Sequence, residues 1–131
     1  MRILIIDDCK EDRELIVEFL EEVDGQKSII TDESDCLKTG LEKLKINHYD
    51  VILLDLALPE SDGIQTVRNI KDALKQNRKQ TPIIILTGLE DYRIGKEAFA
   101  MGIKDFLIKG EICSQDIKRS VNFATYKLAR A

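Results

Sequence analysis

The sequence lacks the features that mark several large classes of protein. Its three cysteines lie far apart without CxxC spacing, which argues against a disulfide framework and against a zinc site. Its single histidine cannot by itself build a metal site or a nucleophile-activating pair. No apolar run approaches the length of a membrane span, and the first residues lead into an acidic pair instead of a signal-peptide cleavage site. We therefore predict a cytoplasmic protein with reduced thiols and no membrane partner.

Clustered positive charge is also missing. The chain has 20 Lys and Arg against 24 Asp and Glu, a formal net charge of -4, whereas a nucleic-acid surface needs clustered cations to neutralise phosphates. We therefore expect no direct contact with nucleic acid. What the chain does have is 131 residues of 44% hydrophobic content, without repeats, low-complexity tracts or linkers. This length and composition predict one domain, residues 1–131, with a full core.

Short apolar runs rich in β-branched residues alternate with segments of helical periodicity. The runs predict strands at residues 3–6, 28–30, 51–54, 83–86 and 106–108. Apolar residues at helical spacing predict helices around 16–23, 37–44, 64–74, 89–101 and 117–128. Asp62 is a candidate N-cap for the third helix, and Gly102 a stop for the fourth. The fivefold βα alternation predicts an α/β fold, a doubly wound parallel sheet with helices on both faces.

Polar residues with complementary chemistry follow four of these strands. Asp7 and Asp8 follow the first strand, Asp55 the third, Thr87 the fourth and Lys109 the fifth. Because the carboxyl ends of parallel strands share one edge of the sheet, we expect these side chains to meet there. Three close carboxylates repel one another unless a cation joins them, and a site of oxygen ligands suits Mg²⁺.

The remaining two groups predict what the metal would help to bind. The Lys109 ammonium and the Thr87 hydroxyl would form a cradle for a tetrahedral anion, which we interpret as a phosphoryl group. Asp55 is the candidate acceptor, because a carboxylate forms an acyl phosphate as a covalent intermediate.

These residues stand in motifs that resemble the response-regulator receiver domain of two-component signalling. The motifs are Asp7-Asp8, "LLDLALP" with Asp55, "ILTG" with Thr87, and "DFLIKG" with Phe106 and Lys109, in the family's order over nearly the whole chain. The resemblance implies a flavodoxin-like (βα)5 sheet of order 2-1-3-4-5. It also implies a phosphorylation-dependent switch that is not an enzyme but assists its own phosphorylation and dephosphorylation.

The resemblance further implies a role for each site residue. Asp55 would accept the phosphoryl group, with Lys109 and Thr87 assisting. Asp8, Asp55 and the backbone carbonyl of Ala57 would bind Mg²⁺ directly. Asp7 would hold the metal through water.

Thr87 and Phe106 match the family's switch pair. The hydroxyl would move onto the phosphoryl group, and the aromatic ring would turn inward into the space vacated. The face remodelled would be the fourth helix, the fifth strand and the fifth helix, through which a homodimer would also form. The phosphoryl donor implied is a histidine kinase or phosphotransfer protein, whereas the downstream effector is not readable from the sequence.

The chain departs from the family at two places near the site. Most relatives follow the lysine with a cis proline, whereas Gly110 follows Lys109; because cis costs about 2.5 to 4 kcal/mol without proline, we predict a trans bond. Ala57 and Leu89 are apolar where relatives tune the attack of water on the phosphorylated aspartate. Neither side chain can orient that water, so we predict slow self-dephosphorylation.

Each site residue also has an ordinary structural explanation when it is taken alone. Asp7 and Asp8 suit the start of a helix, Thr87 suits a strand end, Phe106 suits a core and Lys109 suits solvent. The exposed aromatic residues predicted in the last helix, Phe123 and Tyr126, are candidates for a partner surface.

Three other functions remain alternatives. A receiver-like interaction module would act without phosphorylation, although such proteins usually lose part of the acidic pair, the acceptor or the lysine. A Mg²⁺-dependent aspartyl phosphatase of the haloacid-dehalogenase type needs a second acid where Ala57 stands. A flavodoxin-like cofactor binder needs Gly, Ser and Thr in the first loop, which is acidic here.

Overall fold

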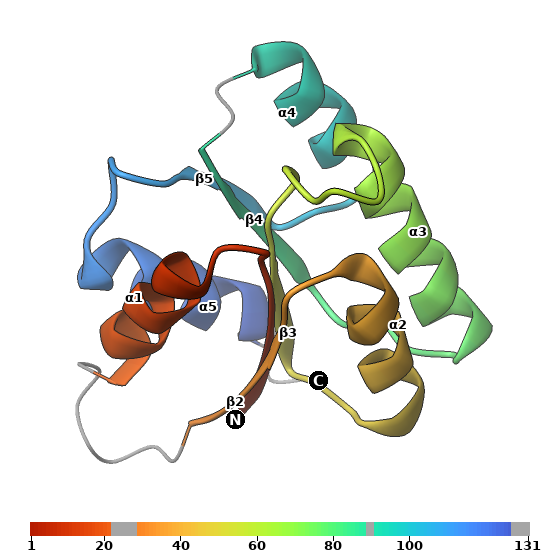
Figure 1. The fold of residues 1–131 in the computed structure, drawn as a ribbon, viewed down its shortest axis with the longest axis horizontal. Helices are drawn as coiled ribbons and strands as arrows, with labels where there is room; N and C mark the ends of the chain where they lie inside the picture. The colour runs from red at the N-terminus through yellow and green to blue at the C-terminus, as the bar shows by residue number, and fades with distance from the viewer. Residues whose placement is uncertain (22–28, 89–90, 127–131) are drawn as a thin grey trace, which may run out of the picture.

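The computed structural model describes residues 1–21, 29–88 and 91–126, and it shows a parallel sheet between two layers of helices (Figure 1). The strands are β1 (Arg2–Ile6), β2 (Ile30–Ser34), β3 (Val51–Leu54), β4 (Ile83–Thr87) and β5 (Asp105–Ile108). The helices are α1 (Lys10–Glu21), α2 (Leu37–Ile46), α3 (Gly63–Gln76), α4 (Tyr92–Ala100) and α5 (Ser114–Thr125). The strand order is β2-β1-β3-β4-β5, which confirms the predicted fold class.

The three central strands form because their sequences are almost wholly apolar. Every residue of β3 and β4 is buried, as is all of β1 after Arg2. Strands buried on both faces are typical of parallel sheets that helices cover on either side. The same runs therefore show no alternation of polar and apolar residues, and the sequence located them to within one residue.

The second strand lies further along the chain than predicted. We expected it at residues 28–30, of which Ser28 lies outside the described residues, whereas β2 runs from Ile30 to Ser34 with the sequence ITDES. It is an edge strand whose Ile30 is exposed, so it needs little apolar character. Its register with β1 is fixed by the ladder from Arg2↔Ile30 to Ile6↔Ser34 and by an ion pair of 2.8 Å between Arg2 and Asp32.

Each face of the sheet carries its own apolar core. On one face α2, α3 and α4 pack over alternate strand residues such as Leu54 and Ile85, and on the other α1 and α5 pack over Leu53 and Leu86 (Figure 1). The residues of β3 and β4 thus serve both cores in turn, as the period of two in a strand requires. None of the helices within the described ranges is long and apolar enough to cross a membrane.

The ends of the helices near the site have identifiable caps. Asp62 occupies the predicted N-cap position of α3, but its side chain makes no cap hydrogen bond. We expected the fourth helix to begin at Leu89, which lies outside the described residues. In the structure α4 begins at Tyr92, because the Asp91 side chain accepts the backbone N–H groups of Arg93 and Ile94. Gly102, at φ 93°, ends α4 as predicted, and the N–H groups of residues 102 and 103 bond back to the last turn in a Schellman arrangement.

Candidate functional site

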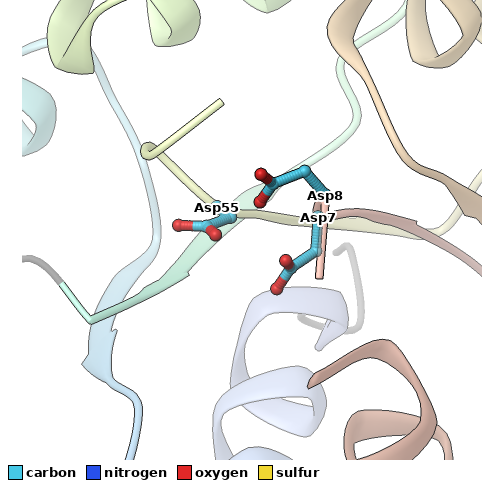
Figure 2. A group of neighbouring side chains, drawn as sticks. All are labelled: Asp7, Asp8 and Asp55. Carbon is cyan, nitrogen blue, oxygen red and sulfur yellow. The ribbon is translucent and has the colours of Figure 1, made fainter. Parts of the chain in front are cut away.

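Three carboxylates meet at the carboxyl edge of the sheet. Asp7 and Asp8 follow β1 and Asp55 follows β3, and one oxygen of each lies within 4.8 Å of the others (Figure 2). The sheet fixes their backbones, because the ladder continues one step beyond the strands: Asp7 N–H donates to Ser34 O and Asp55 N–H to Ile6 O. Asp7 and Asp55 are buried whereas Asp8 is exposed, so the cluster has a closed inner side and an open outer side.

Lys109 brings an ammonium group into this cluster from the end of β5. Its Nζ lies 2.6 Å from Asp7 Oδ2 and 3.0 Å from Asp55 Oδ2, and the two carboxylate side chains are 2% and 4% exposed. A backbone hydrogen bond from Lys109 N–H to Thr87 O anchors the residue to β4. The structure therefore places two of the predicted site residues, Asp7 and Asp55, against this lysine, and Lys109 is not a solvated surface residue.

A further carboxylate at this lysine was not predicted. Asp12, in the first turn of α1, places Oδ2 2.8 Å from Lys109 Nζ. The two residues are 97 positions apart in the sequence. An acid in the first turn of a helix is explained by the helix dipole alone, so no sequence pattern pointed to this contact.

The buried charges shift one another's proton affinity. Burial raises the pKa of the Asp7 carboxyl above its ordinary value, although hydrogen bonds from Lys109 and from the Cys9 backbone oppose the shift. Burial lowers the pKa of Lys109, but hydrogen bonds with its three carboxylate partners outweigh burial and hold that pKa above its ordinary value. The Lys109 hydrogen bond in turn lowers the pKa of Asp12. At neutral pH Lys109 is therefore a charged ammonium, held among acids.

The predicted switch residues lie on the same face of the sheet. Thr87 is fully buried at the end of β4, and its side chain lies on the same face of the sheet as that of Ile85. Ile85 in turn pairs with Phe106 on β5. Phe106 is half-buried and packs against the core beneath α2, α3 and α4. Its ring also lines an open groove of about 540 Å³ between α4 and β5, together with the exposed Tyr92 and Phe99. A rearrangement at Thr87 would therefore change the packing on the face of the sheet that α4 covers.

The loops around the site show two further features. Ala57 is exposed, and its N–H donates to Asp55 Oδ1 at 3.1 Å, which orients the carboxylate. The Lys109–Gly110 peptide bond is trans, like every other peptide bond of the described residues, as the glycine predicted. Gly110 has φ 86°, a conformation that other residues rarely adopt.

The loop after Asp55 also reaches α2, which the sequence did not reveal. Glu60 accepts hydrogen bonds from the N–H groups of Leu37 and Lys38, at 2.9 and 3.2 Å. These bonds hold the pKa of Glu60 below its ordinary value. The N-cap residue of α2, Cys36, makes no side-chain cap bond. The carboxylate of Glu60, 23 residues beyond Leu37, supplies the cap instead.

The contacts of Asp7 and of its neighbour Cys9 argue against two simpler roles, a helix cap and a reactive thiol. Asp7 Oδ1 accepts the N–H of Cys9, two residues on, and is not the N-cap of α1. The Asp12 backbone favours the Cys9 thiolate, but burial and the nearby carboxylates outweigh it and raise the thiol pKa. Cys9 is therefore not an activated thiolate.

Comparisons with known proteins agree with this fold. Residues 3–121 match the response regulator receiver domain. The chain is 36% identical over 107 residues to the transcriptional regulatory protein SrrA of Staphylococcus aureus, a match that covers 82% of this chain and 41% of SrrA. A two-component response regulator from Clostridium difficile has a TM-score of 0.82 at 25% identity, over 99% of both chains. The Francisella response regulator 1452 receiver domain has a TM-score of 0.77 at 28% identity, over 95% of both chains.

The fold and the site define a doubly wound α/β domain with an acidic centre at the carboxyl edge of its sheet. The chain belongs to the response regulator receiver domain family of two-component systems. Because it spans less than half the length of SrrA, the activity of that whole protein is not carried over to it.

Proposed function

We propose that residues 1–131 act as one receiver domain, a signalling switch that accepts a phosphoryl group on Asp55. The observation that carries this proposal is the pairing of a buried Asp55 carboxylate with Lys109 at 3.0 Å beside two further carboxylates. The buried Asp55 carboxylate is paired with an ammonium, and exposed Asp8 marks the open outer side of the site. This arrangement suits the addition of a phosphoryl group to Asp55 from that side. We propose no turnover of an external substrate, so the domain is not an enzyme.

The donor set at this edge fits a magnesium ion. Three carboxylate oxygens within 4.8 Å of one another are the hard ligands that Mg²⁺ takes, and exposed Asp8 leaves room for water on the metal. By family resemblance, Asp8, Asp55 and the Ala57 carbonyl would hold the ion directly, and Asp7 through water. When bound, the ion would neutralise charge on the phosphoryl oxygens.

The chain's own residues prepare Asp55 as the nucleophile. The Ala57 N–H fixes one carboxylate oxygen, and Lys109 offsets the negative charge that gathers beside the other. In the transfer, an Asp55 oxygen forms a bond to phosphorus while the bond from phosphorus to a histidine nitrogen of the donor breaks. The departing nitrogen keeps the electron pair, so no further reactant is needed.

The phosphorylated domain would signal through the α4, β5 and α5 face. A phosphoryl group adds negative charge and acceptor oxygens, which would draw the Thr87 hydroxyl toward Asp55. The space this leaves beneath α4 would admit the half-buried ring of Phe106, and a few kcal/mol of differential contact is enough for such a population shift. The exposed Tyr92 and Phe99 beside Phe106 support this face as the one that changes.

The partners follow from this assignment. The domain would act in the cytoplasm, a histidine kinase or phosphotransfer protein would supply the phosphoryl group, and a homodimer would form through the α4, β5 and α5 face. SrrA is a transcriptional regulatory protein, so an effector domain is a further candidate partner. We propose no direct contact of these residues with nucleic acid or membrane.

The decisive experiment is phosphorylation by a small acyl phosphate. Incubation with Mg²⁺ and acetyl phosphate should add one phosphoryl group to the intact mass, and neither an Asp55→Asn variant nor a magnesium-free sample should gain it. Failure of the wild type with acetyl phosphate and with candidate kinases, together with no Mg²⁺ binding, would favour an interaction module that acts without phosphorylation. The phosphatase alternative is not supported, because Ala57 has no acidic group.

A further inference from the structure

Asp12 contacts the site without belonging to the carboxylate cluster. The oxygens that converge within 4.8 Å come from Asp7, Asp8 and Asp55, and Asp12 is not one of this group. Its Oδ2 instead lies 2.8 Å from Lys109 Nζ, and its side chain is 39% exposed. Asp12 therefore acts on the site through the lysine.

Carboxylates crowd the ammonium of Lys109, and two of them, Asp12 and Asp55, accept its hydrogen bonds. A lysine ammonium carries three N–H donors. Three carboxylates surround it, Asp7 at 2.6 Å, Asp12 at 2.8 Å and Asp55 at 3.0 Å. An oxygen of an incoming phosphoryl group would therefore compete with these carboxylates for the ammonium.

The burial of the three carboxylates decides which one withdraws most readily. Asp7 is 2% exposed, so the loss of the ammonium would leave it as a buried charge with little access to water, whereas Asp55 passes its charge to the phosphoryl group when the acyl phosphate forms. Asp12 is exposed enough for water to replace the lysine at small cost. Of the two carboxylates that keep their charge, Asp12 thus holds Lys109 more weakly than Asp7 does.

We propose that Asp12 is a positioning residue that holds Lys109 in the unphosphorylated protein and competes with the phosphoryl group for its ammonium. This inference rests on the proposed function of Asp55. Once displaced, Asp12 remains a negative charge beside the new anion and repels it. Asp12 therefore weakens the affinity of the site for a phosphoryl group and favours the unphosphorylated form.

A purely structural role for Asp12 makes a different prediction. Acidic residues in the first turn of α1, Glu11 and Asp12, both favour the helix through its dipole. Glu11 is exposed and adjacent, so Glu11→Gln removes the same charge from the same turn without touching Lys109. Asp12→Glu keeps the charge and serves as the conservative variant.

The test is a titration with beryllofluoride, a tetrahedral analogue of the phosphoryl group that binds an aspartate oxygen, in the presence of Mg²⁺. Asp12→Asn should bind it more tightly than the wild type, by roughly three- to tenfold, as expected for the loss of one partly exposed competing charge. Glu11→Gln and Asp12→Glu should stay within about twofold of the wild type by the same reasoning.

A second readout follows the covalent step. With acetyl phosphate, an Asp55 oxygen bonds to phosphorus, the bond from phosphorus to the acetate oxygen breaks, and acetate leaves with the electron pair. The initial rate measured by intact mass should rise in Asp12→Asn in the same direction as the beryllofluoride affinity. Thermal melts of all variants show whether each is folded.

The outcomes separate this inference from the proposed function. Equal or weaker beryllofluoride binding by a folded Asp12→Asn overturns the inference while Asp55 still accepts the group. Equal losses of melting temperature in Asp12→Asn and Glu11→Gln, with unchanged binding, would reduce Asp12 to a helix residue and also overturn it. A wild type that takes up neither beryllofluoride nor a phosphoryl group removes the proposed function, and the inference with it.

Discussion

Replacing Lys109 by methionine tests whether the acidic site is held together by one cation. The substitution keeps most of the side-chain length and removes the ammonium that touches three carboxylates. We expect the variant to be less stable in the absence of divalent metal, and Mg²⁺ to restore part of the loss, because a second cation can join the same oxygens.

The expected loss is worked from the burial of the partners. The contact with Asp12, 39% exposed, contributes roughly 0.2–1 kcal/mol, as surface ion pairs do. Removing one partner of a buried ion pair costs about 3–5 kcal/mol, and Asp7 and Asp55 are at most 4% exposed. Lys109 itself is 20% exposed, and Asp7 can take up a proton, so we expect a total loss of about 2–4 kcal/mol.

The assay is denaturant unfolding in chelator and again in excess Mg²⁺. Lys104→Met is the matched control, since Lys104 is exposed at the opposite end of β5 and its loss should leave stability almost unchanged. A double variant, Asp55→Asn with Lys109→Met, should recover part of the loss because one repelling carboxylate is gone. A loss below about 1 kcal/mol, or a gap from wild type that Mg²⁺ leaves unchanged, would refute the reasoning.

Three further predictions concern residues around the site and the far edge of the sheet. Ala57→Gln should shorten the lifetime of the phosphorylated domain, because a polar group would orient the attacking water; phosphate release at an unchanged rate would contradict this. Burial and the hydrogen bond to Asp32 raise the pKa of Tyr49 from 10.0 to about 12, so its contribution to stability is full below pH 10 and is lost as the pH rises to about 12. Wild-type stability should therefore fall more steeply over that interval than that of Tyr49→Phe, and equal slopes would be evidence against it. Glu60→Gln should lower the melting temperature by weakening the charged cap of α2, whereas Glu42→Gln, exposed within the same helix, should not; equal effects would exclude a cap.

Sequence predicts a strand best where both faces of the strand are buried, because such positions require apolar residues. β1, β3 and β4 are buried on both faces, so their apolar runs mark their positions directly. β2 breaks this rule because it is an edge strand, paired only with β1 and mostly not buried, and its ITDES sequence is held by the ladder and by the Arg2–Asp32 ion pair. Its position depends on contacts with β1 that no local pattern contains.

The site divides in a similar way. Asp7, Asp55 and Lys109 were predictable because a topological rule sends residues after parallel strands to one edge, whatever their separation in sequence. Asp12 and Glu60 lie beyond that rule, on a helix and within a loop, and each acts on a partner from another element. Their sequence context is equally consistent with solvated acids, so only the folded chain distinguishes the two readings.

The residues that follow the topological rule would carry the proposed chemistry, and the sheet fixes their backbones. Asp12 contacts Lys109 from a helix that packs against the opposite face from α4, while Glu60 joins the loop after Asp55 to α2. Substitutions at these two positions would alter the charge around the lysine or the hold on the loop without removing the acceptor. The affinity for a phosphoryl group can therefore change while the capacity to accept one is kept.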